Sequence, residues 1–329
     1  MTASSRLTVT GDEMKESAPI EQEPTAAADA GPDGGERPAA PRERAGGATA
    51  PGELRADCIA DSAGGLTFDL TAPQGTPVAW SAALVLRRRG GDGPDDEVRL
   101  PLGPNGAGRL RAVLPSTVAL AEGRWNAYAD LGDGEEPRRL QPGVNDLRSL
   151  VDRRPLAGIG RLGVRIPYAT KFGNLALRSW LRGPHAEAGD ILLAPDGMTV
   201  SGRLYGAVPA AGAQAEARAR RTPGAPDTEP ATVTAPLTVD GAEFTFTLPY
   251  AELAGHWEAG SEPWDLWLRP AEGARPVRIA RLLDDVADKK QVFSYPALPV
   301  PADAGALRIG PYYTLDNDLA IRVAGPAGG

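Results

Sequence analysis

The chain has 329 residues and a formal net charge of −8 at pH 7. Its 40 Gly and 32 Pro together exceed a fifth of the residues, which interrupts the chain too often for long helices and favours an all-β fold. The one cysteine, Cys58, excludes an intrachain disulfide framework and predicts a buried, unreactive thiol.

The first 54 residues differ in composition from the rest. They are rich in Ala, Gly, Pro and Glu and contain no aromatic residue. Such a segment cannot bury enough apolar surface to offset the entropy of ordering, about 1–2 kcal/mol per residue. We expect residues 1–54 to be a disordered tail, which acts either as a solubilising extension or as a tether to a partner.

Charge and hydropathy limit the partners and the location. The tail holds ten acidic and five basic residues, so only −3 of the net charge falls on the remaining chain, and nothing indicates an electrostatic grip on nucleic acid. No run of about 18 apolar residues occurs, which predicts no membrane span. The N-terminus lacks the basic start and apolar run of a secretory signal, so we expect a cytoplasmic protein.

Short strand patterns begin after the tail. Residues 66–70 (LTFDL) alternate apolar and polar side chains, and residues 83–86 (ALVL) form a second apolar run. Clusters of turn residues separate such runs, as at 89–96 (RGGDGPDD). This spacing is typical of an antiparallel β-sandwich.

The second half of the chain repeats the landmarks of the first half in the same order. Residues 167–170 (PYAT) and 175–178 (LALR) return as 311–314 (PYYT) and 319–322 (LAIR). The offset grows from 134 residues at 109–115 (RLRAVLP) and 243–249 (EFTFTLP) to 144 at the terminal phrase. The repeat therefore predicts a duplicated domain whose copies differ in loop length.

The second copy contains the same kinds of strand. We expect strands at 198–204, 216–220, 232–234, 244–248 and 264–268. Residues 210–221 contain good helix formers and could form a helix, but their alignment to 84–89 favours a strand. We predict domain one at 55–182 and domain two at 188–324, joined by residues 181–189.

Patterns that carry catalysis are scarce. The two histidines, His185 and His256, have no partner at metal-ligand spacing, and one cysteine leaves too few ligands for a His/Cys metal site. The H-x-x-x-x-D pattern from His185 to Asp190 matches some glycerolipid acyltransferases, but it lies between two strand-rich domains and we interpret it as a chance match. No phosphate loop, Gly-x-Ser-x-Gly elbow or Rossmann-like unit occurs. We predict no cofactor, no metal and no catalytic residue.

Two groups of acidic residues are the remaining candidates for a cation site. Residues 316–318 (DND) match the D-x-D motif with which many glycosyltransferases hold a divalent ion, but the first copy has Phe172, Gly173 and Asn174 there, which favours a hairpin turn. Residues Asp284, Asp285 and Asp288 could surround a cation, although a solvated charged loop is the favoured interpretation.

Aromatic and basic residues recur in both copies. Trp125 and Tyr128 correspond to Trp264 and Trp267, and we expect the first residue of each pair to anchor a core. Trp267 follows Trp264 by three residues, so in a strand it faces the opposite side. Two basic pairs each follow an aspartate, and such pairs either hold an anion or form ion pairs with Asp152 and Asp288. The candidate glycan-binding residues are Trp267, Tyr128, Tyr313, Arg153, Arg154, Lys289 and Lys290.

Three segments carry a family resemblance: 264–267 (WDLW), 283–290 (LDDVADKK) and 311–322 (PYYTLDNDLAIR). With them the chain resembles the C-terminal accessory region of actinobacterial glycosyltransferases and glycerophosphotransferases that build cell-wall polymers. More distantly, it resembles the tandem immunoglobulin-like modules at the C-terminus of wall teichoic acid glycosyltransferases. The resemblance covers about residues 190–323 well and 60–180 loosely. It implies modules for oligomerisation or polymer binding, although we expect no catalytic domain in this chain.

We therefore predict two tandem immunoglobulin-like antiparallel β-sandwiches behind a disordered tail. The expected function is that of a non-catalytic accessory or scaffold module in envelope-polymer synthesis. Its predicted partner is a glycan, a polyol-phosphate polymer or a glycosyltransferase, and a homo-oligomer is a further possibility. Two alternatives stay open: a metal-dependent transferase that uses Asp316 and Asp318, and a purely structural oligomerisation unit.

Overall fold

A computed structural model describes residues 54–71, 75, 77–106, 108–155, 160–220, 229–303 and 305–325. The predicted disordered tail lies outside these ranges except for its last residue, Leu54, which is buried. Residues Thr49–Gly329 form one compact unit. Within the described ranges, no helix has the length and apolar character needed to cross a bilayer.

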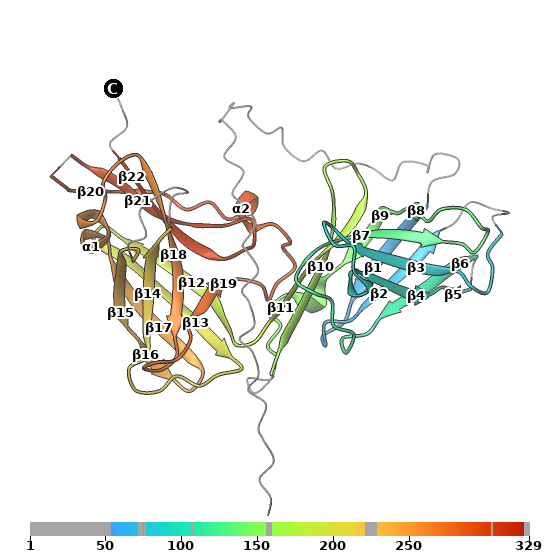
Figure 1. The fold of residues 1–329 in the computed structure, drawn as a ribbon, viewed down its shortest axis with the longest axis horizontal. Helices are drawn as coiled ribbons and strands as arrows, with labels where there is room; N and C mark the ends of the chain where they lie inside the picture. The colour runs from blue at the N-terminus through green and yellow to red at the C-terminus, as the bar shows by residue number, and fades with distance from the viewer. Residues whose placement is uncertain are drawn as a thin grey trace, which may run out of the picture. The chain divides into compact units, whose positions relative to one another are not determined.

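The first copy of the repeat folds into two sheets, shown from blue to green in Figure 1. One has the strand order β5–β6–β2–β1–β9, and the other has the order β10–β11–β7–β3–β4 with β8 beside β7. The strands are β1 (Arg55–Ala60), β2 (Leu66–Thr71), β3 (Ala83–Arg88), β4 (Glu97–Pro101), β5 (Gly103–Pro104), β6 (Arg109–Leu114), β7 (Gly123–Asp130), β8 (Arg138–Arg139), β9 (Gln141–Asp146), β10 (Leu162–Ala169) and β11 (Leu175–Arg182).

The second copy has the same strand order in one continuous hydrogen-bonded path, β16–β17–β13–β12–β19–β18–β22–β21–β20, with β14 beside β18 and β15 beside β14. Its strand β19 pairs with both β12 and β18, as β9 and β8 do separately with β1 and β7. The elements are β12 (His185–Ala194), β13 (Gly197–Tyr205), β14 (Gln214–Ala219), β15 (Thr232–Pro236), β16 (Thr238–Asp240), β17 (Glu243–Pro249), α1 (Tyr250–Gly255), β18 (Ser261–Arg269), β19 (Val277–Ala280), α2 (Lys289–Val292), β20 (Leu298–Val300), β21 (Leu307–Tyr313) and β22 (Leu319–Ala324).

The predicted all-β architecture of antiparallel sandwiches is confirmed. The alanine-rich segment forms strand β14 and not a helix, because it pairs with both β15 and β18. Each copy also contains one parallel pair that the sequence pattern does not reveal, β1 with β9 and β12 with β19. The segment expected to join the copies is mostly strand, since β11 ends at Arg182 and β12 begins at His185.

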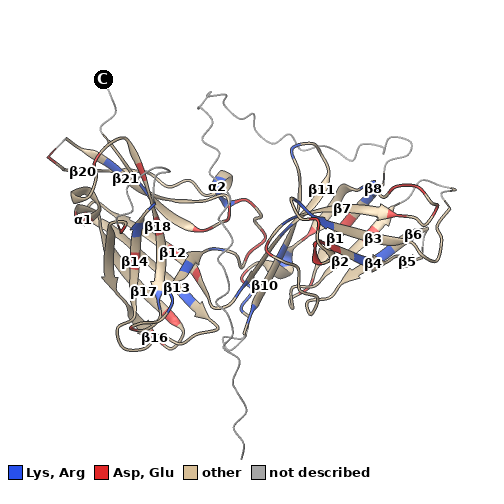
Figure 2. Cartoon of the chain, in the orientation of Figure 1, with Lys and Arg blue, Asp and Glu red and all other residues tan. Residues whose placement is uncertain are grey.

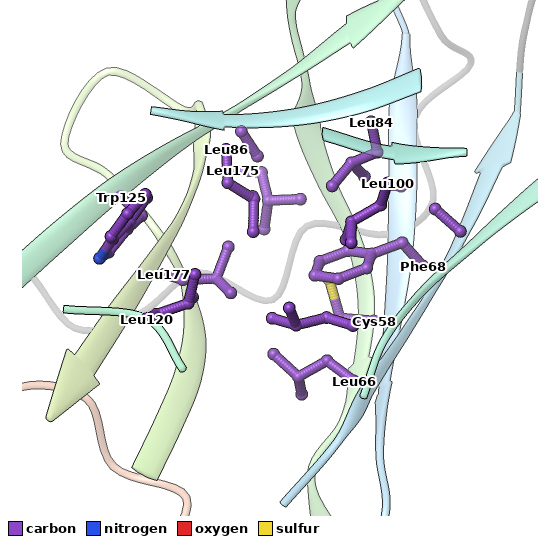
Figure 3. Packing of buried hydrophobic residues seen from close by; sticks show 14 of the residues in the cluster. Cys58, Leu66, Phe68, Leu84, Leu86, Leu100, Leu120, Trp125, Leu175 and Leu177 are labelled. Carbon is purple, nitrogen blue, oxygen red and sulfur yellow. The ribbon is translucent and has the colours of Figure 1, made fainter. Parts of the chain in front are cut away.

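Most of the buried hydrophobic side chains fall into two clusters, one centred on each copy, and the first also takes in Tyr205, Ala280, Leu282 and Leu283 of the second copy. In the first copy, side chains from β1, β2 and β3, among them Cys58, Phe68 and Leu84, meet those of β11 (Figure 3). Trp125 and Trp264 are fully buried, which confirms their predicted role as core anchors. Burial of each large apolar side chain contributes about 1.5–3 kcal/mol, so these clusters fix which strand faces are left exposed to solvent.

Candidate functional site

A cleft of about 910 Å³ lies in the described part of the chain. Its floor is formed by residues of β7, β8, β10 and β11 and by Arg89, which directly follows β3, and the β10–β11 hairpin, helix α2 and the β21–β22 hairpin border it. We call it the basic cleft. The residues that line it include Arg89, Arg124, Asn126, Arg139, Tyr168, Lys171, Phe172, Asn174, Arg178, Val292 and Leu315.

The alternation of inward and outward side chains along β7 places basic residues on the floor of the cleft. Trp125 points into the core and is fully buried, so its neighbours Arg124 and Asn126 point outward. Tyr128 lies on the same outer face, between the guanidinium groups of Arg87 at 5.3 Å and Arg139 at 4.8 Å from its ring centre. Strand β8, which consists of two arginines, is blue in Figure 2.

The floor carries positive charge without carboxylate partners. Within the described residues, no carboxylate lies at ion-pair distance from Arg89, Arg124, Arg139 or Lys171, and Asp288 is the only acidic residue in the lining. Arg89 donates to the amide oxygen of Asn126 at 2.8 Å. The Nη1 atom of Arg139 is buried without a hydrogen-bond partner. A group of cations without carboxylate partners at the surface of a cleft favours an anionic ligand.

The edge of the cleft is apolar. Phe172 of the β10–β11 hairpin is 78% exposed, Val292 of α2 62% and Leu315 of the β21–β22 hairpin 54%. The ammonium group of Lys171 lies 4.9 Å from the Phe172 ring centre. The cleft therefore offers cations and apolar surface together, which suits a ligand that has both anionic groups and C–H faces.

The D-x-D motif forms the predicted turn. It lies between β21 and β22, where Asn317 adopts a φ of 61°, as Asn does in tight turns. Both carboxylates bind arginines of the first copy: Asp316 pairs with Arg178, and Asp318 lies 2.7 Å from Arg182. A search of the described residues finds no group of three or more His, Cys, Asp or Glu side chains that could hold a metal ion.

The loop at 284–290 departs from the sequence interpretation. Asp284 is buried, and its carboxylate accepts from Lys289 Nζ at 2.6 Å and from Arg281 Nε at 3.2 Å. The prediction that this loop is simply solvated is therefore wrong for Asp284. Burial lowers the pKa of Lys289, although the charge of Asp284 opposes this shift. Asp288, which was expected to pair with the basic residues, makes no ion pair within the described chain.

Two of the predicted glycan-binding residues are fully buried. Lys289 is enclosed by Asp284 and the carbonyl of Val286, so its predicted surface role is wrong. Tyr313 points into the second core, where its ring meets Phe293 edge-on at 5.8 Å and burial raises its pKa. Both predictions failed because a strand or loop position was judged without knowing which face the core would take.

The other basic pair also divides into two roles. Arg153 donates to the backbone carbonyls of Ser62 at 3.2 Å and Ala63 at 2.9 Å, and burial lowers its pKa. It therefore fastens a turn of the first copy and is not free for a ligand. Arg154 is exposed and lines a second hollow of about 380 Å³, which has both acidic and basic residues. Neither arginine forms the expected pair with Asp152 in the described chain.

Lys290, Tyr128 and Trp267 are accessible. Lys290 is exposed, and the two aromatic residues are half-buried on outer strand faces. Trp267 faces away from the buried Trp264, as predicted from their spacing. Sequence reasoning missed Arg89, Arg124 and Arg139, whose only signal is the position of basic residues on the outward side of the strands or in the loops next to them.

Comparisons with known proteins give little further information. No protein-family model matches the chain, and no curated protein matches its sequence. Two similar solved structures are crystal structures of S. aureus TarS, one of them of its residues 217–571. Each is 12% identical with a TM-score of 0.28, and the matches cover 59% and 61% of this chain. They span only 35% and 56% of the TarS chains, and a match this weak carries no argument about function.

Proposed function

We propose that this protein is a non-catalytic accessory module that binds an anionic cell-envelope polymer in the basic cleft. The observation that carries the proposal is the group of cations Arg89, Arg124, Arg139 and Lys171, which have no carboxylate partner in the described chain, beside an exposed aromatic ring. The family resemblance of the terminal phrase points to the same class of ligand. We also propose that the sandwiches are immunoglobulin-like and that the protein acts in the cytoplasm.

A polyol-phosphate chain fits the chemistry of the cleft. Planar guanidinium groups bind phosphate oxygens with paired hydrogen bonds, so Arg89, Arg124 and Arg139 supply the donors. The C–H groups of a polyol or sugar pack on aromatic faces, which Tyr168 and Phe172 present. Neutral glycans would use only the second kind of contact.

The accessible residues predicted from the sequence take supporting roles in this proposal. Tyr128 holds Arg139 by a cation–π contact and thereby positions it. Trp267, Arg154 and Lys290 lie outside the lining of the basic cleft, and we propose them as further contacts along an extended polymer. A partner glycosyltransferase would be held close to this protein because both bind the same polymer.

Polymer co-sedimentation tests the proposal. The full chain is mixed with a teichoic-acid-like polymer or with neutral dextran, and the bound fraction is measured. We expect binding to the first polymer only, and a loss of at least about tenfold in affinity for Arg124→Ala/Arg139→Ala, since each charge-assisted contact is worth about 1.5–3 kcal/mol.

Arg148→Ala is the matched control, because Arg148 is exposed and pairs with Asp146 at 2.7 Å outside the cleft. Equal binding by the wild-type chain and the double variant would overturn the role of the cleft. A defined oligomer whose size does not change when polymer is added would favour the purely structural alternative.

A further inference from the structure

The two copies of the repeat contain the same Arg–aromatic–Arg arrangement. In the first copy Arg139 is paired in register with Tyr128, and in the second Arg278 is paired with Trp267. Both arginines lie 4.8 Å from the ring centre, and a second arginine lies at 5.3 Å in each copy. The duplication has therefore preserved the positions of the cations, which makes their surroundings directly comparable.

In the second copy, carboxylates neutralise these cations. Arg278 lies 3.1 Å from Asp265 and 3.4 Å from Asp318. Arg220 lies 2.5 Å from the other oxygen of Asp265. Hydrogen bonds from Arg220 and the charge of Arg278 hold the pKa of Asp265 below its usual range against the opposing effect of its burial. In the second copy, the arginines equivalent to Arg89 and Arg139 are therefore both bound to carboxylates.

The first copy has asparagine at both carboxylate positions. Asn126 occupies the place of Asp265, since these residues pair with Ala176 and Ala320 in the corresponding strands. Asn174 occupies the place of Asp318 at the end of the matching turn, where each residue precedes the leucine that starts the last strand. An amide oxygen accepts a hydrogen bond from Arg89 but cancels no charge.

We infer that Asn126 and Asn174 keep an oxyanion site open in the first copy, where two aspartates close the equivalent place in the second. Arg89, Arg124 and Arg139 line the cleft without carboxylate partners in the described chain and supply the donors. The ligand group is a phosphodiester or a similar oxyanion. This inference rests on the proposed function and adds that the oxyanion site lies in the first copy, with these two amides as the specificity-determining residues.

Substitution of the amides by their second-copy counterparts tests this inference. The full-length Asn126→Asp/Asn174→Asp variant is titrated with a synthetic glycerol-phosphate oligomer by calorimetry. We expect at least a tenfold loss of affinity and a weaker dependence of affinity on salt. Each lost phosphate contact reduces the slope of log affinity against log salt by about 1. Asn145→Asp, an exposed position on β9, adds the same kind of charge outside the cleft and should bind like wild type.

The outcomes separate the two proposals. If the wild-type chain does not bind the oligomer, the proposed function fails and this inference fails with it. If the wild-type chain binds and the double variant binds equally well, the inference is overturned while the proposed function stands. Thermal melting checks that the variants fold, and the single Asn126→Asp variant serves if the double variant does not, with the same expected loss of affinity.

Discussion

Two adjacent lysines show how strongly the fold differentiates neighbouring residues. Lys289 is fully buried against Asp284, whereas Lys290 is exposed. The sequence placed both in one charged loop and could not separate them, because the burial depends on packing between α2, β21 and the turn at Asn317. The side-chain amide of Asn317 accepts from the backbone nitrogen of Lys289 at 3.1 Å and so helps to fix this segment.

Removal of the buried lysine should be costly. Lys289→Ala breaks the buried ion pair and leaves Arg281 as the remaining cationic partner of Asp284, so we expect a loss of about 3 kcal/mol in the free energy of unfolding, the lower end of the range for a broken buried pair. Lys290→Ala should change it by less than about 0.5 kcal/mol. Urea denaturation of both variants measures the difference, and similar midpoints for the two would contradict the buried ion pair.

At the scale of elements, the sequence revealed the alternation of apolar and polar side chains along single strands, but it did not reveal which distant strands pair. The alanine-rich segment at 214–219 has helical propensity, yet it becomes β14 because both of its edges are taken by strands. The short strands β8 and β19 left no local signal in the sequence, and neither did β9, the parallel partner of β1. The pairing of these strands depends on tertiary contacts.

Strand β14 carries a carboxylate whose ionisation supports the sheet. Burial alone would raise the pKa of Glu216, but hydrogen bonds from Arg269, Gln214 and Arg218 outweigh it and hold the pKa below the ordinary 4.5. A folded-state pKa below the unfolded value means that this stabilisation is complete above pH 4.5 and is lost as the pH falls through the folded-state value.

The variant Glu216→Gln should therefore be less stable than wild type at pH 7, by about 1–3 kcal/mol, because two arginines lose their anionic partner. The difference should shrink as the pH falls through the folded-state pKa of Glu216, because the wild-type carboxylate then becomes protonated as well. Urea midpoints at pH 7 and pH 3 test this expectation. A difference that is the same at both pH values would show that Glu216 acts through packing alone.

For the whole molecule, the repeat was the strongest sequence signal, and the basic cleft was not visible in it. The landmarks revealed two equivalent sets of strands, and the structure shows the same strand order in both. The cleft needs parts of both copies, since Leu315 and α2 border a floor made by the first. Contacts of Arg178 and Arg182 with the turn at 316–318 bring these parts together, and such long-range pairs have no periodic pattern in a sequence.

In the proposed function, a few side chains on strands and in turns decide what each copy can bind. The strands preserve a common frame, while the charges around the two central arginines differ through Asn126 and Asn174 in one copy and Asp265 and Asp318 in the other. The exposed ring of Phe172 at the cleft edge has no aromatic counterpart in the second copy, where Asp316 takes its place. Binding chemistry has thus been altered on an unchanged scaffold.

The central claim is that the basic cleft binds a polyanion mainly through its cations. It is tested most directly by titration of the full-length wild-type chain with a glycerol-phosphate oligomer at several salt concentrations. Three or four phosphate contacts predict a slope of log affinity against log salt of about −2 to −3 for a flexible single chain. Binding that does not change with salt, or no binding at low salt, would contradict the account.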